Sequence, residues 1–154
     1  MPLTVRTFIP VDAEAFRRLN EEWIERHFRL EEKDRETLRN PQQIIDDGGQ
    51  VLMAYLDDEP VGCCALVRMD GDSFEVAKMA VTLRQQGRGF GRAVLVATIE
   101  EARRLGAKRL YLETNSSLAP AITLYHSLGF CDIPADRAPK SPYVRADVFM
   151  EMFL

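Results

Sequence analysis

The sequence predicts a mixed α/β domain, built on a twisted, largely antiparallel sheet of about six or seven strands with about four flanking helices. Three strand-like runs at 51–57, 61–68 and 74–81 follow one another at the spacing of β-hairpins. A glycine-rich loop and a helical run then lead into a strand-like run at 109–114, which predicts a parallel crossover. The length of 154 residues, with 46% hydrophobic and 29% charged residues, fits one domain over 1–154 with a buried core.

The first fifty residues predict one strand and two helices. Residues 3–9 alternate between apolar and polar side chains, as a strand does. Asp12 is the expected N-cap of a helix that runs to about His27. A short helix is expected at 41–47, because a proline occupies its first position. The charge-rich residues 28–40 between these helices predict a solvated loop or a short helix.

The C-terminal part predicts two helices and three strands, the first of which is the run at 109–114 named above. A helix is expected at 90–105, ended by a glycine. Ser116 or Ser117 is expected to cap the next helix, which ends before a second glycine. A short strand at 130–134, a proline-containing loop and a last strand at 144–153 complete the chain.

Composition excludes several classes of function. The net charge of −4 and the pI of about 5.3 argue against nucleic acid as a partner. No apolar run approaches the roughly 20 residues that cross a membrane, and no signal peptide is recognised at the start. Cys63, Cys64 and Cys131 lack disulfide spacing, which favours reduced thiols in a cytoplasmic protein. With two histidines and no Cys-x-x-Cys, no metal site is expected.

The most informative segment is Gln86–Arg92, which joins a strand to a helix. Gly87, Gly89 and Gly91 alternate within it. Glycine permits positive φ and close backbone approach, and a helix N-terminus presents free N–H groups, so the segment predicts a site for a diphosphate. A P-loop would need Lys-Ser/Thr after the glycines, and a dinucleotide site would need Gly-x-Gly-x-x-Gly in an opening βαβ unit. Neither pattern is present.

Three motifs in order resemble the GCN5-related N-acetyltransferase (GNAT) superfamily. Residues 86–91 are similar to its acyl-CoA loop, Gln/Arg-x-x-Gly-x-Gly/Ala. Residues 75–81 resemble its fourth strand, and 121–130 resemble its Ala-x-x-Leu-Tyr-x-x-Leu-Gly-Phe signature. The resemblance implies a sheet that splays between two parallel strands, with acetyl-CoA as co-substrate, no metal, and a homodimer as a family-level expectation.

The resemblance also implies which residues bind the cofactor. Backbone N–H groups from Arg88 to Arg92 would hold the diphosphate, while Met79 and Val81 would pair with the pantetheine arm. Arg88 and Arg92 are otherwise solvated arginines, and Asn115 is either a pantetheine ligand or a helix cap. The full set of expected cofactor residues is Met79, Val81, Gln86, Gly87, Arg88, Gly89, Phe90, Gly91, Arg92, Asn115 and Tyr125.

For catalysis, the resemblance implies direct acetyl transfer to a primary amine, of a small molecule or of a protein, in a ternary complex. Tyr125 is the expected general acid for the thiolate, and Glu75 the expected base, with Glu113 as its rival. The alternative is a non-catalytic acyl-CoA sensor, which would not need Tyr125. Acceptor specificity is expected to depend on residues 23–46 and 134–147.

Overall fold

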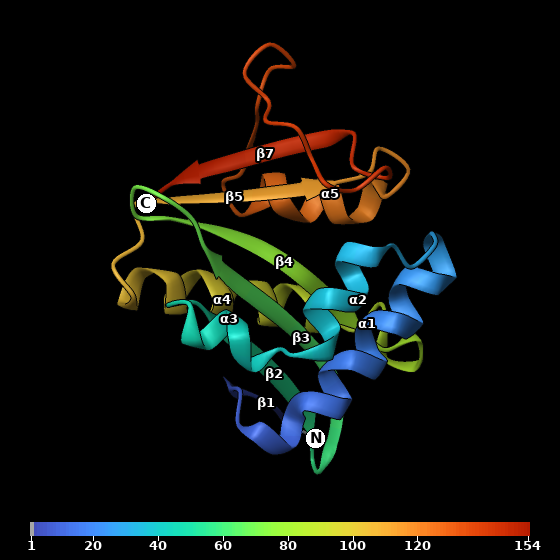
Figure 1. Cartoon of the computed structure of the whole chain (residues 1–154). Helices are drawn as coiled ribbons and strands as arrows, with labels where there is room; N and C mark the ends of the chain where they lie inside the picture. Colours follow the sequence, from blue (N-terminus) through green and yellow to red (C-terminus); the bar gives the residue numbers. More distant parts are fainter. Residues whose placement is uncertain (1) are drawn as a thin grey trace.

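The computed structural model describes residues 2–154 and contains one seven-stranded sheet in the order β1-β2-β3-β4-β5-β7-β6 (Figure 1). All neighbouring strands are antiparallel except the parallel pair β4–β5, which confirms the predicted mixed sheet. The strands are β1 (Leu3–Thr7), β2 (Gln50–Leu56), β3 (Glu59–Arg68), β4 (Ser73–Val81), β5 (Arg109–Thr114), β6 (Cys131–Asp132) and β7 (Val148–Phe153).

Within residues 2–154 five α-helices and two 3-10 helices accompany the sheet, one α-helix more than expected. The helices α1 to α3 lie on one face of the sheet and α4 lies on the other (Figure 1). Their bounds are η1 (Pro10–Asp12), α1 (Ala13–His27), α2 (Glu32–Arg39), α3 (Gln42–Asp46), η2 (Leu83–Gln85), α4 (Phe90–Arg104) and α5 (Ala119–Ser127).

Two apolar clusters hold these layers together. On one face Phe16 and Leu19 of α1, which are three residues apart and so lie on one side of the helix, pack against β2 and β3. On the other face Val94 and Leu95 of α4 join a cluster that includes Tyr125 of α5. Phe16 has no exposed surface, and full burial of such a side chain contributes about 2–3 kcal/mol. The sheet is therefore packed on both faces.

Several predicted boundaries were wrong. Neither Ser116 nor Ser117 caps α5, because Leu118 occupies the N-cap and Ser116 instead hydrogen-bonds Asp147. Asp12 does occupy the N-cap of α1, but its carboxylate binds Arg6 and the Tyr55 hydroxyl rather than the helix. The last strand begins at 148 rather than 144.

Candidate active site

The parallel strands β4 and β5 separate at the centre of the molecule. They pair only over Ser73–Glu75 and Arg109–Tyr111, so the facing edges beyond those residues lack a partner strand. A cavity of about 780 Å³ occupies the opening. Every expected cofactor or catalytic residue except Arg88 lines it. The splay that the family resemblance implies is therefore present, and it gathers the predicted residues.

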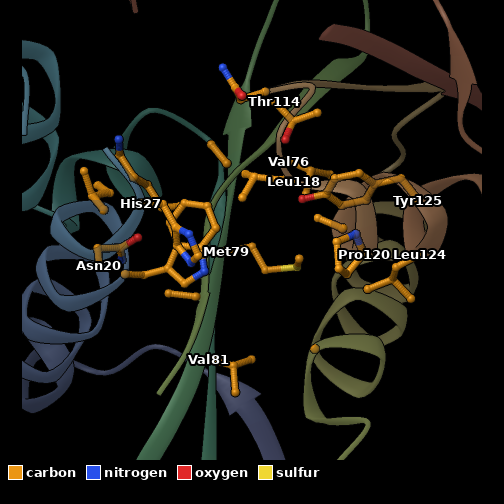
Figure 2. Close-up of a pocket in the computed structure, with 18 of the residues that line it drawn as sticks. Asn20, His27, Val76, Met79, Val81, Thr114, Leu118, Pro120, Leu124 and Tyr125 are labelled. Carbon is orange, nitrogen blue, oxygen red and sulfur yellow. The ribbon is translucent and has the colours of Figure 1, made fainter. Parts of the chain in front are cut away.

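A β-bulge interrupts β4 within this opening. The partner of Cys63 is Ala80 and that of Ala65 is Ala77, so β4 contains one residue more than β3 between these pairs. Lys78 in the bulge has a φ of 54°, which is rare for a residue with a side chain. In Figure 2 the Met79 side chain points across the cavity toward α5. The bulge was not foreseen, because no glycine marks it.

The glycine loop has the backbone geometry that the sequence predicts. Gly87 and Gly89 adopt φ of 80° and 78°, and Gly89 is the N-cap of α4. The first helical hydrogen bond joins Ala93 N–H to the Gly89 carbonyl, so the N–H groups of Phe90 to Arg92 lack helical partners. A Cβ at Gly89 would meet nothing within 4 Å. The left-handed backbone, not crowding, is therefore what favours glycine there.

Two predicted arginines flank this loop. Arg88 is exposed, donates to Gln85 Oε1 and stacks over the Phe90 ring at 4.9 Å. Arg92 lines the cavity and donates to the Ser127 hydroxyl at 3.2 Å. Both arginines are exposed, and they differ in that Arg92 lines the cavity and Arg88 does not.

Tyr125 projects from α5 into the cavity. Its hydroxyl points toward the centre of the opening in Figure 2. Its ring packs edge-on against that of Phe130, with the two ring centroids 5.9 Å apart. Burial raises the pKa of the hydroxyl well above its usual range, and the Cys64 thiol adds to the rise. The hydroxyl therefore stays protonated at neutral pH and is able to donate a proton to a stronger acceptor.

The two candidate bases have different surroundings. Burial, reinforced by the nearby Glu113 carboxylate, raises the pKa of Glu75 to about 7. Within residues 2–154 the Glu75 side chain makes no hydrogen bond. Glu113, in contrast, accepts bonds from the hydroxyls of Tyr111 at 2.8 Å and Ser141 at 2.5 Å. Glu75 has the free carboxylate and the pKa suited to a base at neutral pH.

The amide of Asn115 is engaged within the protein. Its Nδ2 donates to the Arg145 carbonyl at 2.7 Å, and its Oδ1 accepts from Ser117 N–H at 2.9 Å. Asn115 therefore fixes the loop after β5 to the segment before β7. It still lines the cavity, so its role toward a ligand stays a prediction.

Sequence reasoning missed a buried ionic network at the end of the cavity away from the glycine loop. The Asp34 side chain has no exposed surface and accepts bonds from Lys78 Nζ at 2.5 Å and from both terminal nitrogens of Arg145. These bonds hold the pKa of Asp34 down to about 2, against the opposing effect of its burial. The partners lie 44 and 111 residues away along the chain, so no local pattern indicates the network.

The sequence predicts neither a membrane-spanning segment nor a metal site. Between residues 2 and 154 no helix has the length and apolar character needed to cross a membrane. In the same range no group of three or more His, Cys, Asp or Glu side chains is arranged to hold a metal ion.

Comparison with known proteins identifies the family. The model of the acetyltransferase (GNAT) family matches residues 13–130. "Uncharacterized N-acetyltransferase YsnE" of Bacillus subtilis is 40% identical over 87 residues, which cover 54% of this chain and 58% of that protein. The match thus spans little more than half the length of this curated relative.

Solved structures agree with the fold. A GNAT-family acetyltransferase from Staphylococcus aureus superposes with a TM-score of 0.88 at 18% identity, covering 99% of both chains. A Bacillus subtilis acetyltransferase solved in complex with CoA has a TM-score of 0.74 at 19% identity, again over 99% of both chains. The splayed sheet, the glycine loop and the match over residues 13–130 lead to one conclusion: this chain belongs to the acetyltransferase (GNAT) family.

Proposed function

We propose that this protein is an N-acetyltransferase that moves the acetyl group of acetyl-CoA to a primary amine by direct transfer in a ternary complex. The observation that carries the proposal is a single cavity with a helix N-terminus at one end and the unpaired Glu75 carboxylate lining its wall, with the Tyr125 hydroxyl directed into it. A phosphate-binding end, a proton acceptor and a proton donor in one opening are what acyl transfer from a thioester requires.

The protein offers a fitting cradle for CoA. The free N–H groups of Phe90 to Arg92 and the positive end of α4 suit a diphosphate. The unpaired edge of β4, including Met79 and Val81, suits the amides of a pantetheine arm, which pair as an added strand would. Bound there, acetyl-CoA supplies the activated thioester.

The side chains then divide the proton transfers. Glu75 accepts a proton from the incoming ammonium, directly or through water, so that the neutral amine is the attacking species. Backbone N–H groups near the β4 bulge polarise the thioester carbonyl. Tyr125 donates a proton to the departing thiolate and regains one from the nitrogen that has attacked, which loses its extra proton as the amide forms. Because the ordinary thiol pKa of about 8.5 lies below that of tyrosine, and burial raises the pKa of Tyr125 further, donation alone is uphill and the returned proton offsets its cost.

The test is CoA release, measured by thiol detection, with acetyl-CoA and a panel of primary amines. At least one amine is expected to release CoA and to become acetylated, as mass spectrometry of the product would show. Tight acetyl-CoA binding with no acetylation of any amine would instead favour the sensor hypothesis.

A further inference from the structure

A bridge between two segments flanks the cavity on the side away from the glycine loop, and Tyr143 and Arg145 of the bridge line it. We define the bridge as Glu31 and Asp34, at the start of α2, together with residues 143–145 of the segment before β7. Arg145 donates to both oxygens of Asp34 at 2.7 and 2.8 Å, and Val144 N–H donates to Glu31 at 3.0 Å. In Figure 1 the α1–α2 turn and the segment leading into β7 lie at the same end of the molecule.

The bridge is also bonded to β4. Lys78, in the bulge, donates to Asp34 and to the Tyr143 hydroxyl at 3.0 Å, and its side chain is only 6% exposed. Separating the two halves of the bridge would leave Asp34 and Lys78 buried with fewer partners, which is strongly unfavourable. The bridge is therefore a fixed wall. With acetyl-CoA bound at the glycine-loop end, a polypeptide that approaches Glu75 from the opposite side would meet this wall, which Tyr143 and Arg145 present to the cavity.

Three aromatic rings form another wall of the same cavity. Trp23 and His27 lie in the last part of α1, and Phe28 follows it. The ring centroid of Trp23 lies 4.9 Å from that of His27 and 6.2 Å from that of Phe28. Figure 2 shows His27 facing the opening. Adjacent ring faces of this kind favour contact with a flat apolar group.

The charges around the cavity favour an ammonium group. Lys78 and Arg145 line the cavity, but both are already paired with Asp34, and Arg145 also with Glu31. They therefore offer little free positive charge to an anionic acceptor. Two carboxylates line the cavity, Glu75 and Glu113. Glu113 accepts two hydrogen bonds, whereas Glu75 has no hydrogen-bonded partner within residues 2–154.

We infer that the acceptor is a small primary amine with a flat apolar body, and that the bridge excludes the amines of polypeptides. This inference rests on the proposed acetyltransferase function. The aromatic wall holds the apolar body, the Glu75 carboxylate receives the ammonium group, and the bridge sets the limit of size.

The experiment compares three acceptors with acetyl-CoA and the whole chain: 2-phenylethylamine, isoamylamine, and a hexapeptide with a free N-terminal amine. The value of kcat/KM is expected to be highest for 2-phenylethylamine and about tenfold lower for isoamylamine, because ring contacts of this kind contribute up to that factor. No turnover of the hexapeptide is expected. Turnover of the hexapeptide above that of both small amines, or equal use of the two small amines, would overturn the inference while leaving the proposed function in place.

Two variants at Trp23 separate specificity from folding, and a third variant tests the bridge. Trp23→Ala is expected to raise KM for 2-phenylethylamine without raising KM for isoamylamine, whereas general damage to the fold would raise both. Trp23→Phe, which keeps a ring, is expected to retain the preference. Arg145→Ala opens the bridge and is expected to permit acetylation of the hexapeptide if its thermal unfolding shows a folded chain. The wild-type comparison decides the acceptor class by itself, and failure of every amine while acetyl-CoA still binds would overturn the proposed function as well.

Discussion

The two ends of the cavity are built in different ways. The glycine-loop end is made of backbone from consecutive segments, namely the free edge of β4, Gly87 to Gly89 and the first turn of α4. The opposite end is made of side chains from α1, α2, β4 and the segment before β7. The first end therefore suits a ligand that backbone groups recognise, whatever the neighbouring side chains are. The second end suits a ligand whose recognition depends on the side chains of the individual protein.

The two ends are also expected to differ in what a substitution changes, namely ligand binding or the stability of the fold. The backbone end carries little buried charge, while the side-chain end holds Asp34, Lys78 and Arg145 in one network with little exposed surface. A substitution at the backbone end should therefore affect cofactor binding more than folding. A substitution in the network should affect folding first.

The largest effect is expected at the side-chain end. Asp34→Asn leaves the buried Lys78 without its carboxylate partner, and we expect a loss of about 3–5 kcal/mol in the free energy of unfolding, measured by urea denaturation. The matched control is Glu31→Gln, because Glu31 is more exposed and its bond to Arg145 is longer, at 3.3 Å. A loss below about 1 kcal/mol for Asp34→Asn, similar to that for the control, would show that the network is no anchor.

The next largest effect is expected on the rate of catalysis. Tyr125→Phe removes the hydroxyl that points into the cavity, and we expect kcat to fall by about a hundredfold or more, the usual contribution of a general acid. The Kd for acetyl-CoA should stay unchanged, because the ring still packs against Phe130. Steady-state kinetics with isothermal titration calorimetry measures both quantities. An undiminished rate would remove Tyr125 from the mechanism.

The stability of the protein is expected to depend on pH through Glu75. Its pKa rises from 4.5 to about 7 on folding, so the folded state holds the proton more tightly than the unfolded chain. The contribution of Glu75 to the free energy of unfolding is therefore fully present below pH 4.5 and is lost as the pH rises through 7. We expect Glu75→Gln to be more stable than the wild type by about 2 kcal/mol at pH 8, with no such gain at pH 4. Unfolding free energies at the two pH values check this, and an equal difference at both would contradict the raised pKa.

The sequence allowed the backbone end to be predicted in detail. The alternate glycines, the strand before them and the tyrosine signature are contiguous patterns, and all but Arg88 of the predicted residues line the cavity. The meander β2–β4 and the crossover to β5 followed from turn residues and periodicity.

The side-chain end could not be predicted, for physical reasons. Residues 28–40 read as a solvated loop or short helix, yet Asp34 within α2 is fully buried because its partners arrive from β4 and from the segment before β7. The bulge at Lys78 has no glycine to announce it. Ser116 was predicted as a cap, but tertiary contact with Asp147 took its hydroxyl.

The smallest effect tests the central claim most directly, namely that the backbone at the start of α4 binds the diphosphate of acetyl-CoA. Gly89 and Gly106 bound α4 at its two ends, have φ of 78° and 86°, and would each place a Cβ in open space. Alanine at either position costs a similar strain of about 1–2 kcal/mol. Isothermal titration calorimetry with acetyl-CoA is expected to show a Kd about tenfold weaker for Gly89→Ala and an unchanged Kd for Gly106→Ala. Equal affinities for the two variants would contradict a diphosphate site at the start of α4.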